Sequence, residues 1–222
     1  MHAMASQPGS LRQFRERELV AATRALFDER GMQDAPIEEI AKAVGIARGL
    51  IYRQFSSKEE LFVLTVTDYL SELAGLLDTA STSEPDPVRR VELLMEAYAG
   101  FCLRYPAFLD CSLSLMHRPA RELQATVSDA VWLRLGQGMA GCVRHVTQVL
   151  QDGNEAGVFS VDDPDLLAQV LWTQVLGAMH IARIGVGIRE LAPGVPELFR
   201  VEADAVVAAC VQSALATIGR KA

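Results

Sequence analysis

Five residues within one short segment are suited to contact with a nucleic acid, each in a different way: Arg48, Gly49, Leu50, Tyr52 and Arg53. Arg48 can reach a phosphate or a guanine edge, and Arg53 lies near the end of the same helix face. Leu50 suits a thymine methyl contact, and Tyr52 can hydrogen-bond a phosphate through its hydroxyl. Gly49 has no side chain, which allows close approach to a groove. The segment predicts contact with double-stranded DNA. The alternatives are that the arginines are ordinary solvated charges and that the tyrosine packs in the core.

The pattern around this segment predicts two short helices joined by a tight turn. A first helix over 11–30 braces a second over 37–44 and a third over 48–54. Gly45 lies between the short helices, where glycine can take a left-handed conformation that turns the chain sharply. In a helix-turn-helix, the second of the paired helices enters the major groove and its N-terminal residues meet the base edges. This arrangement places Arg48 at the bases.

The run from Ile40 to Phe62 is similar, almost position for position, to the signature of the TetR (tetracycline-repressor) family. Its specific part is the spacing Tyr-x-x-Phe-x-x-Lys-x-x-Leu, which begins at Tyr52 and includes Lys58. The resemblance implies a ligand-responsive DNA-binding transcriptional regulator, a repressor released from a palindromic operator by a small effector. It also implies that Lys58 contacts a phosphate at the start of the fourth helix, where the helix dipole favours an anion. The alternative for Lys58 is a solvated surface charge.

Two positions depart from the family pattern. Where the family usually caps the second helix with Ser or Thr, this chain has Asp34-Ala35-Pro36, and a carboxylate there would repel a nearby phosphate. Ala47 stands where the family often has Ser at the start of the third helix. Each missing hydroxyl removes one hydrogen bond to a phosphate. These departures bear on individual contacts and not on the docking mode.

Helical periodicity recurs along the whole chain, and strand signals are almost absent. Apolar steps of three and four, divided by Pro and Gly, predict an all-α fold of about nine helices. The expected ranges are 11–30, 37–44, 48–54, 58–77, 88–105, 107–116, 120–151, 164–184 and 197–218. We expect two domains: a helix-turn-helix DNA-binding domain over 11–57, and a helical ligand-sensing and dimerisation domain over 58–222.

The last two expected helices are suited to dimerisation, because their small residues allow helices to approach closely. A homodimer is expected on physical grounds, since one reading module binds DNA weakly and a two-fold axis pairs two of them. The candidate dimerisation residues are Leu171, Val175, Ala178, Met179, Ala182, Ala205, Ala208, Ala209 and Gln212. The alternative is that this stripe belongs to the core of a single chain.

The resemblance also places a ligand pocket in the helical body. Candidate ligand-binding residues on the inner helix faces are Tyr98, Cys102, Tyr105, Trp132, Met139, His145, Trp172 and His180. Because this lining is mainly apolar and aromatic, we expect a hydrophobic or aromatic effector. For each of these residues, simple core packing is the alternative.

The charge and the cysteines bear on the expected partners, metals and cofactors. The net charge of −7 argues at first sight against nucleic acid, but the segment 10–62 is neutral and the acidic excess lies after it. The four cysteines form no CxxC pair and no histidine lies at metal-ligand spacing from them, so we expect buried reduced thiols, no metal and no cofactor.

Enzymes and membrane proteins are disfavoured as well. The chain has no Gly-rich phosphate loop, no HExxH and no Gly-x-Ser-x-Gly, so we do not expect an enzyme. No apolar run has the length of a signal peptide or a membrane span, which favours a cytoplasmic protein. The alternative function is a ligand-binding or protein-interaction module with a degenerate helix-turn-helix.

Overall fold

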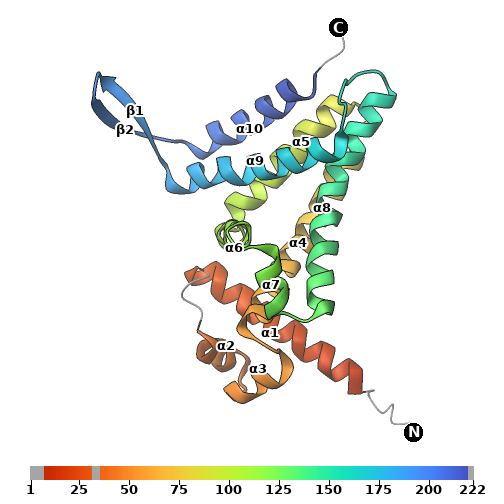
Figure 1. The fold of residues 1–222 in the computed structure, drawn as a ribbon, viewed down its shortest axis with the longest axis vertical. Helices are drawn as coiled ribbons and strands as arrows, with labels where there is room; N and C mark the ends of the chain where they lie inside the picture. The colour runs from red at the N-terminus through yellow and green to blue at the C-terminus, as the bar shows by residue number, and fades with distance from the viewer. Residues whose placement is uncertain (1–7, 32–35, 220–222) are drawn as a thin grey trace. The chain divides into compact units, whose positions relative to one another are not determined.

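The computed structural model describes residues 8–31 and 36–219, which form ten α-helices and one two-stranded antiparallel sheet (Figure 1). The elements are α1 (Pro8–Arg30), α2 (Ile37–Val44), α3 (Arg48–Gln54), α4 (Lys58–Thr82), α5 (Pro87–Arg104), α6 (Pro106–Met116), α7 (Ala120–Thr126), α8 (Asp129–Glu155), α9 (Pro164–Ile184), β1 (Val186–Ala192), β2 (Val195–Arg200) and α10 (Ala203–Thr217). The predicted helical fold class is confirmed. None of the helices described is both long and apolar enough to cross a membrane.

The described residues divide into two compact units. The first unit holds residues within Met1–Tyr69 and Asp110–Gln137, and the second holds residues within Leu70–Leu109 and Gly138–Ala222. Helices α4, α6 and α8 therefore contribute residues to both units. The domain boundary expected after residue 57 stays a prediction.

The inward faces of α1, α2 and α3 build much of the core of the first unit. The buried apolar residues there include Leu19, Leu26, Phe27, Ile37, Ile40, Ala41, Ile51 and Phe55. Polar contacts tie α1 to α4: the Tyr69 hydroxyl donates to Asp28 at 2.6 Å, and Arg24 pairs with Asp68 at 2.8 Å. These contacts fix α1 on α4.

Gly45 closes the turn between α2 and α3. It has φ 72° and ψ 30°, the left-handed region in which a side chain is strained. Its N–H donates to the carbonyl of Lys42 at 3.1 Å, and the N–H of Ile46 donates to the carbonyl of Ala41 at 2.9 Å. This pair of bonds is the Schellman motif, which satisfies the last carbonyls of a helix. The predicted glycine turn is confirmed, while Asp34 and Ala35 lie outside the described residues.

Helices α5, α9 and α10 pack on one another in the second unit. The carboxylate of Asp86 accepts from the N–H of Val88 at 3.1 Å, and that of Asp163 accepts from the N–H of Leu166 at 2.9 Å. Each capping aspartate is followed by a proline in the first turn. Both features mark helix starts in a sequence, and the two predicted starts agree closely with the structure.

Two predicted helix ranges are wrong. The helix expected over 120–151 is two helices, because α7 ends at Thr126 and α8 begins at Asp129. The backbone N–H and the hydroxyl of Ser128 donate to the carboxylate of Glu60, so tertiary hydrogen bonds interrupt a continuous apolar stripe. The helix expected over 58–77 continues to Thr82. The hydroxyls of Thr79 and Thr82 donate to carbonyls one turn back, so both polar groups find a partner within the helix.

The loop expected between the last two helices is a β-hairpin. Strands β1 and β2 pair antiparallel with Ile188 opposite Leu198, and Gly194 takes a φ of 78° at the turn. The hairpin carries no Asn-Gly or Asp-Gly pair, which are the strongest short-range hairpin signals, and its strands are short. The predicted start of the last helix at residue 197 is also wrong, because that residue lies in β2 and α10 begins at Ala203.

Candidate functional site

Helix α3 docks on the first unit through one residue and exposes most of the others. Ile51 is 1% exposed, whereas Leu50 is 37% and Tyr52 47% exposed. Arg48, Gly49 and Arg53 are exposed as well, so all the residues proposed to read DNA from this helix lie at the surface. Large apolar and aromatic side chains at the surface of a short helix mark a face available to a partner.

Arg48 is held by two neighbours on the surface. Its guanidinium pairs with the carboxylate of Glu38 on α2 at 2.5 Å. The same group lies 5.4 Å from the centre of the Tyr52 ring, and one of its nitrogens donates to the Tyr52 hydroxyl at 3.4 Å. The hydrogen bond to Tyr52 and the charge of Glu38 raise the pKa of Arg48. The arginine is therefore positioned at the N-terminus of α3, beside a carboxylate that competes with phosphate.

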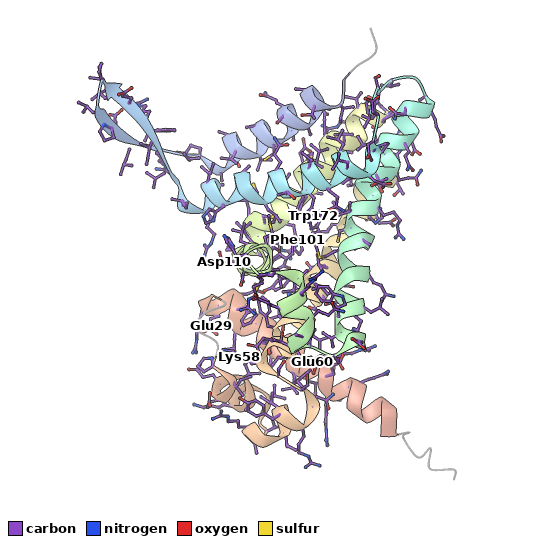
Figure 2. All side chains as sticks on the ribbon, in the orientation of Figure 1. Glu29, Lys58, Glu60, Phe101, Asp110 and Trp172 are labelled. Atoms are coloured by element: carbon purple, nitrogen blue, oxygen red, sulfur yellow. The ribbon has the colours of Figure 1, made fainter. Side chains whose placement is uncertain are left out.

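Lys58 is the first residue of α4 and is exposed (Figure 2). The hydroxyl of the preceding Ser57 accepts from the N–H of Glu60 at 3.0 Å, and the carboxylate of Glu60 accepts from the N–H of Ser56 at 2.6 Å. This arrangement is a variant of the capping box. It uses the N–H of Glu60 within the protein and leaves the Lys58 ammonium exposed at the helix start.

The same cap links α4 to the junction of α7 and α8. The Ser57 hydroxyl donates to the carbonyl of Thr126 at 2.8 Å, and the Ser128 hydroxyl donates to Glu60. Burial raises the pKa of Glu60, but the hydrogen bonds from Ser128 and Ser56 outweigh it and lower the pKa overall. Glu60 is 6% exposed, so a buried carboxylate with four donors fixes the first turn of α4.

Two of the candidate ligand-binding residues stack on each other in the second unit. The rings of Tyr98 and Trp172 lie 4.2 Å apart at an interplanar angle of 20°, and both residues are buried (Figure 2 labels Trp172). The Tyr98 hydroxyl has no hydrogen-bond partner among the described residues. Burial is the larger cause of the raised pKa of Tyr98, and the nearby Cys102 and Cys142 raise this pKa further. The structure thus brings Tyr98, Cys102 and Trp172 together around one orphaned polar atom.

Two other candidates already have polar partners. The Tyr105 hydroxyl donates to Glu72 at 2.9 Å. The Nδ1 atom of His145 lies 3.4 Å from the Ser81 hydroxyl, and burial lowers the pKa of His145. The last three candidates have other surroundings: Met139 and His180 are exposed in the second unit, and Trp132 is a half-buried residue of the first. A ligand role for these five residues stays a prediction.

The candidate dimerisation residues differ in exposure. Leu171, Val175 and Met179 are buried within their own chain, and Ala178 and Ala182 are half-buried. The exposed candidates are on α10: Ala205, Ala208, Ala209 and Gln212. On α9 a shallow groove is lined by residues that the sequence analysis does not single out: Gln169, Val170, Thr173 and Gln174. Gln174 also donates to Ser213 of α10, so the two helices present one joined surface.

Two acidic residues that organise the candidate DNA-binding face, Glu38 and Glu60, are not among the predicted site residues. The sequence around Glu38 does not indicate its pairing with Arg48, because the two residues meet only through the turn between their helices. The sequence around Glu60 does indicate its role, since Ser57-x-x-Glu60 is the spacing of a capping box. Among the described residues, no cluster of His, Cys, Asp and Glu is arranged to hold a metal ion.

An exposed short helix that follows a Schellman turn and is braced by a longer helix defines a helix-turn-helix DNA-binding domain. Residues 19–64 match the family described as bacterial regulatory proteins, tetR family. The match to the tetR family thus lies in this domain, which makes up about a fifth of the chain.

The relatives agree with this assignment. The chain is 35% identical over 81 residues to the HTH-type transcriptional repressor KstR2 of Mycolicibacterium smegmatis, an alignment that covers 35% of this chain and 38% of that protein. The chain thus spans between 38% and 49% of the length of the curated relatives it matches.

Solved structures share the fold along nearly the whole chain. The tetR-family regulator PfmR from Thermus thermophilus has a TM-score of 0.62 at 20% identity, with 92% of this chain and 99% of that chain covered. The regulator FadR from Bacillus subtilis, solved in complex with stearoyl-CoA, has a TM-score of 0.67 at 12% identity, with 91% and 98% covered. Identities this low show a common fold.

Proposed function

We propose that this chain is a one-component transcriptional regulator that binds a palindromic operator as a homodimer and is released by a small effector. The observation that carries the proposal is the exposed face of α3 behind the Gly45 turn, with Arg48, Leu50, Tyr52 and Arg53 at the surface. Repression is the expected mode, as in the name of the relative KstR2. The DNA-binding domain spans 11–57 and the sensing and dimerisation domain 58–222.

In the proposed complex, Arg48, Gly49 and Leu50 meet the base edges, and Tyr52, Arg53 and Lys58 contact phosphates. Two reading helices related by a two-fold axis contact half-sites about 34–36 Å apart, which is one turn of DNA. The two-fold axis is proposed to pass through the surface formed by α9 and α10. Small exposed alanines on α10 and the groove on α9 support that placement, because both allow a second helix pair to approach closely.

The effector is proposed to be a hydrophobic or aromatic molecule that carries a polar group. The stacked Tyr98 and Trp172 rings offer an apolar aromatic surface, and the unpartnered Tyr98 hydroxyl offers one hydrogen bond. A buried hydroxyl without a partner is costly, so a ligand that supplies the partner gains from meeting it. The stearoyl-CoA held by FadR, a protein of the same fold, also has a long apolar portion.

Release from DNA is proposed to be a population shift. The dimer exists in one state that fits the operator and another that does not, and the effector binds the second state better. Helix α4 is continuous from Lys58 to Thr82 and carries residues of both units, so it is the proposed link between effector and reading helix. Operator affinity with and without effector tests this mechanism, and equal affinities would refute it.

The direct test of DNA binding is a mobility-shift assay on the DNA upstream of the chain's own gene, at several salt concentrations. A regulator binds this DNA with an affinity that falls as salt rises, and Arg48→Ala weakens the binding. The second candidate function is a ligand-binding or protein-interaction module with a degenerate helix-turn-helix. Its supporting observations are the net charge of −7 and the missing hydroxyl at Ala47. Absence of any sequence preference across the upstream DNA would favour that candidate.

The proposed role includes no enzymatic reaction, in keeping with the relatives, which are named as regulators. We propose that the protein acts in the cytoplasm, where its operator DNA lies. It needs no metal or cofactor for the proposed contacts.

A further inference from the structure

The side chains on the two faces of the β1–β2 hairpin differ in the contacts that they make within the hairpin. On one face, Arg189 pairs with Glu197 at 2.6 Å, and its guanidinium lies 5.7 Å from the centre of the Phe199 ring. The same ring lies directly over Gly187, where an added Cβ would clash with it. Part of this face is therefore occupied by contacts within the hairpin itself, although Phe199 remains 38% exposed.

The opposite face carries an exposed apolar cluster, with Arg200 opposite Val186 and Glu190 at its other end. Val186 and Ile188 are two residues apart on β1, and Leu198 lies directly opposite Ile188 on β2, so the three side chains share one face. Their exposed fractions are 40% for Val186, 74% for Ile188 and 69% for Leu198. An isolated two-stranded hairpin is marginally stable in water, and packing against another element stabilises it. Adjacent exposed apolar side chains of this size mark an interaction surface.

The uncovered face continues the proposed dimerisation surface. Ile181 and Ile184, on the last turns of α9 before the hairpin, are 48% and 54% exposed, and Val170 further back is 47% exposed. Figure 1 shows the hairpin extending from the end of α9. Exposed apolar residues therefore continue along the chain from this helix into β1. A partner that covers α9 thus reaches the base of the hairpin.

The continuity of this face with the proposed dimerisation surface favours a second copy as the cover. Stable interfaces bury about 800 Å² from each partner, and the exposed candidates on α10 are mainly alanines, which contribute little area each. Val186, Ile188 and Leu198 would add large exposed apolar side chains to those of α9. We propose that the face formed by Val186, Ile188 and Leu198 packs on the second copy of this chain and extends the interface beyond the helices. This inference rests on the proposed dimer.

The first experiment compares the double variant Ile188→Ser/Leu198→Ser with the wild-type chain by sedimentation equilibrium. The expected result is a dimer dissociation constant raised by about tenfold or more, with unchanged helical circular dichroism. The matched control is Leu76→Ser/Leu133→Ser, which removes two exposed leucines from α4 and α8, 40% and 60% exposed. The control is expected to leave the dissociation constant unchanged.

The second experiment needs no variant. Amide hydrogen exchange in 186–200 of the wild-type chain is followed above and below the dimer dissociation constant, and dilution is expected to accelerate it. A wild-type dimer with concentration-independent exchange there, and an unchanged dissociation constant in the double variant, would overturn the hairpin proposal and leave the proposed regulator intact. A wild-type chain that binds the operator as a monomer would instead overturn the dimer, and this inference with it.

Discussion

The guanidinium of Arg48 and the carboxylate of Glu38 form an ion pair at 2.5 Å that joins the two helices of the helix-turn-helix. The side chains are 58% and 56% exposed, so solvent screens the pair and it contributes little to the stability of the fold. The ion pair matters instead for how Arg48 binds DNA. A phosphate or a guanine that takes Arg48 must displace Glu38, which stays close by as a like charge to the phosphates.

Replacing Glu38 with Gln is therefore expected to strengthen operator binding several-fold, because it removes both the competing partner of Arg48 and a repulsive charge. Fluorescence anisotropy with labelled operator DNA at several salt concentrations measures the effect. The matched control is Glu39→Gln, the same change one residue further along α2, where the carboxylate pairs with Arg30 instead. Weaker binding by Glu38→Gln would show that the ion pair presents Arg48 to the DNA and does not compete for it.

Arg48 and Lys58 are expected to differ in what they contribute. Arg48→Ala is expected to cost about 1–3 kcal/mol of binding free energy and to relax the preference at one base pair. Lys58→Ala is expected to weaken binding equally across sequences and to reduce the salt slope by about 1. Binding to the operator and to single-base variants, with Arg144→Ala on α8 as a control, separates the two. Uniform weakening by both substitutions would assign Arg48 to a phosphate.

The buried carboxylate of Glu60 makes the stability of the first unit depend on pH. Although burial raises its pKa, the hydrogen bonds from Ser128 and Ser56 lower it below the ordinary value of 4.5. A folded pKa below the unfolded one stabilises the protein at neutral pH, and this contribution is lost as the pH falls through the folded pKa. Ser128→Ala is expected to lower the free energy of unfolding by about 1–2 kcal/mol at pH 7 and by less at an acidic pH below the folded pKa of Glu60.

Denaturant unfolding at the two pH values measures this difference, with Ser71→Ala, at an exposed position of α4, as the control. An equal loss in Ser128→Ala at both pH values would mean that the serine stabilises the junction of α7 and α8 without involving the charge of Glu60.

The helix-turn-helix formed by α2 and α3 can be predicted from the sequence because its signals are local. The predicted ranges 37–44 and 48–54 coincide with α2 and α3, because a glycine at the turn and one inward apolar face per helix determine this motif. The helix starts at Asp86 and Asp163 are equally local, since cap and proline are neighbours in sequence.

Interactions between distant residues account for what the sequence does not reveal. Ser128 donates to Glu60 across 68 positions, and that contact breaks a helix which the apolar periodicity predicts to be continuous. The β1–β2 hairpin is the same kind of case, because its apolar side chains alternate over too few residues to be distinguished from a loop. Tyr98 and Trp172 are each recognisable as inward residues, but their stacking depends on how α5 packs against α9.

Tyr98 and Tyr105 form a natural pair of test and control on α5 and its C-cap. The hydroxyl of Tyr98 has no partner among the described residues, whereas that of Tyr105 donates to Glu72 at 2.9 Å. Tyr98→Phe is therefore expected to leave the melting temperature unchanged or raised, while Tyr105→Phe lowers the free energy of unfolding by about 1 kcal/mol. If an effector hydrogen-bonds to Tyr98, the first variant also needs a higher effector concentration to release operator DNA, and the second does not. Calorimetry and an effector-dependent shift assay give the two readouts, and a Tyr98→Phe protein that is less stable yet responds normally would place a structural partner, not an effector, at that hydroxyl.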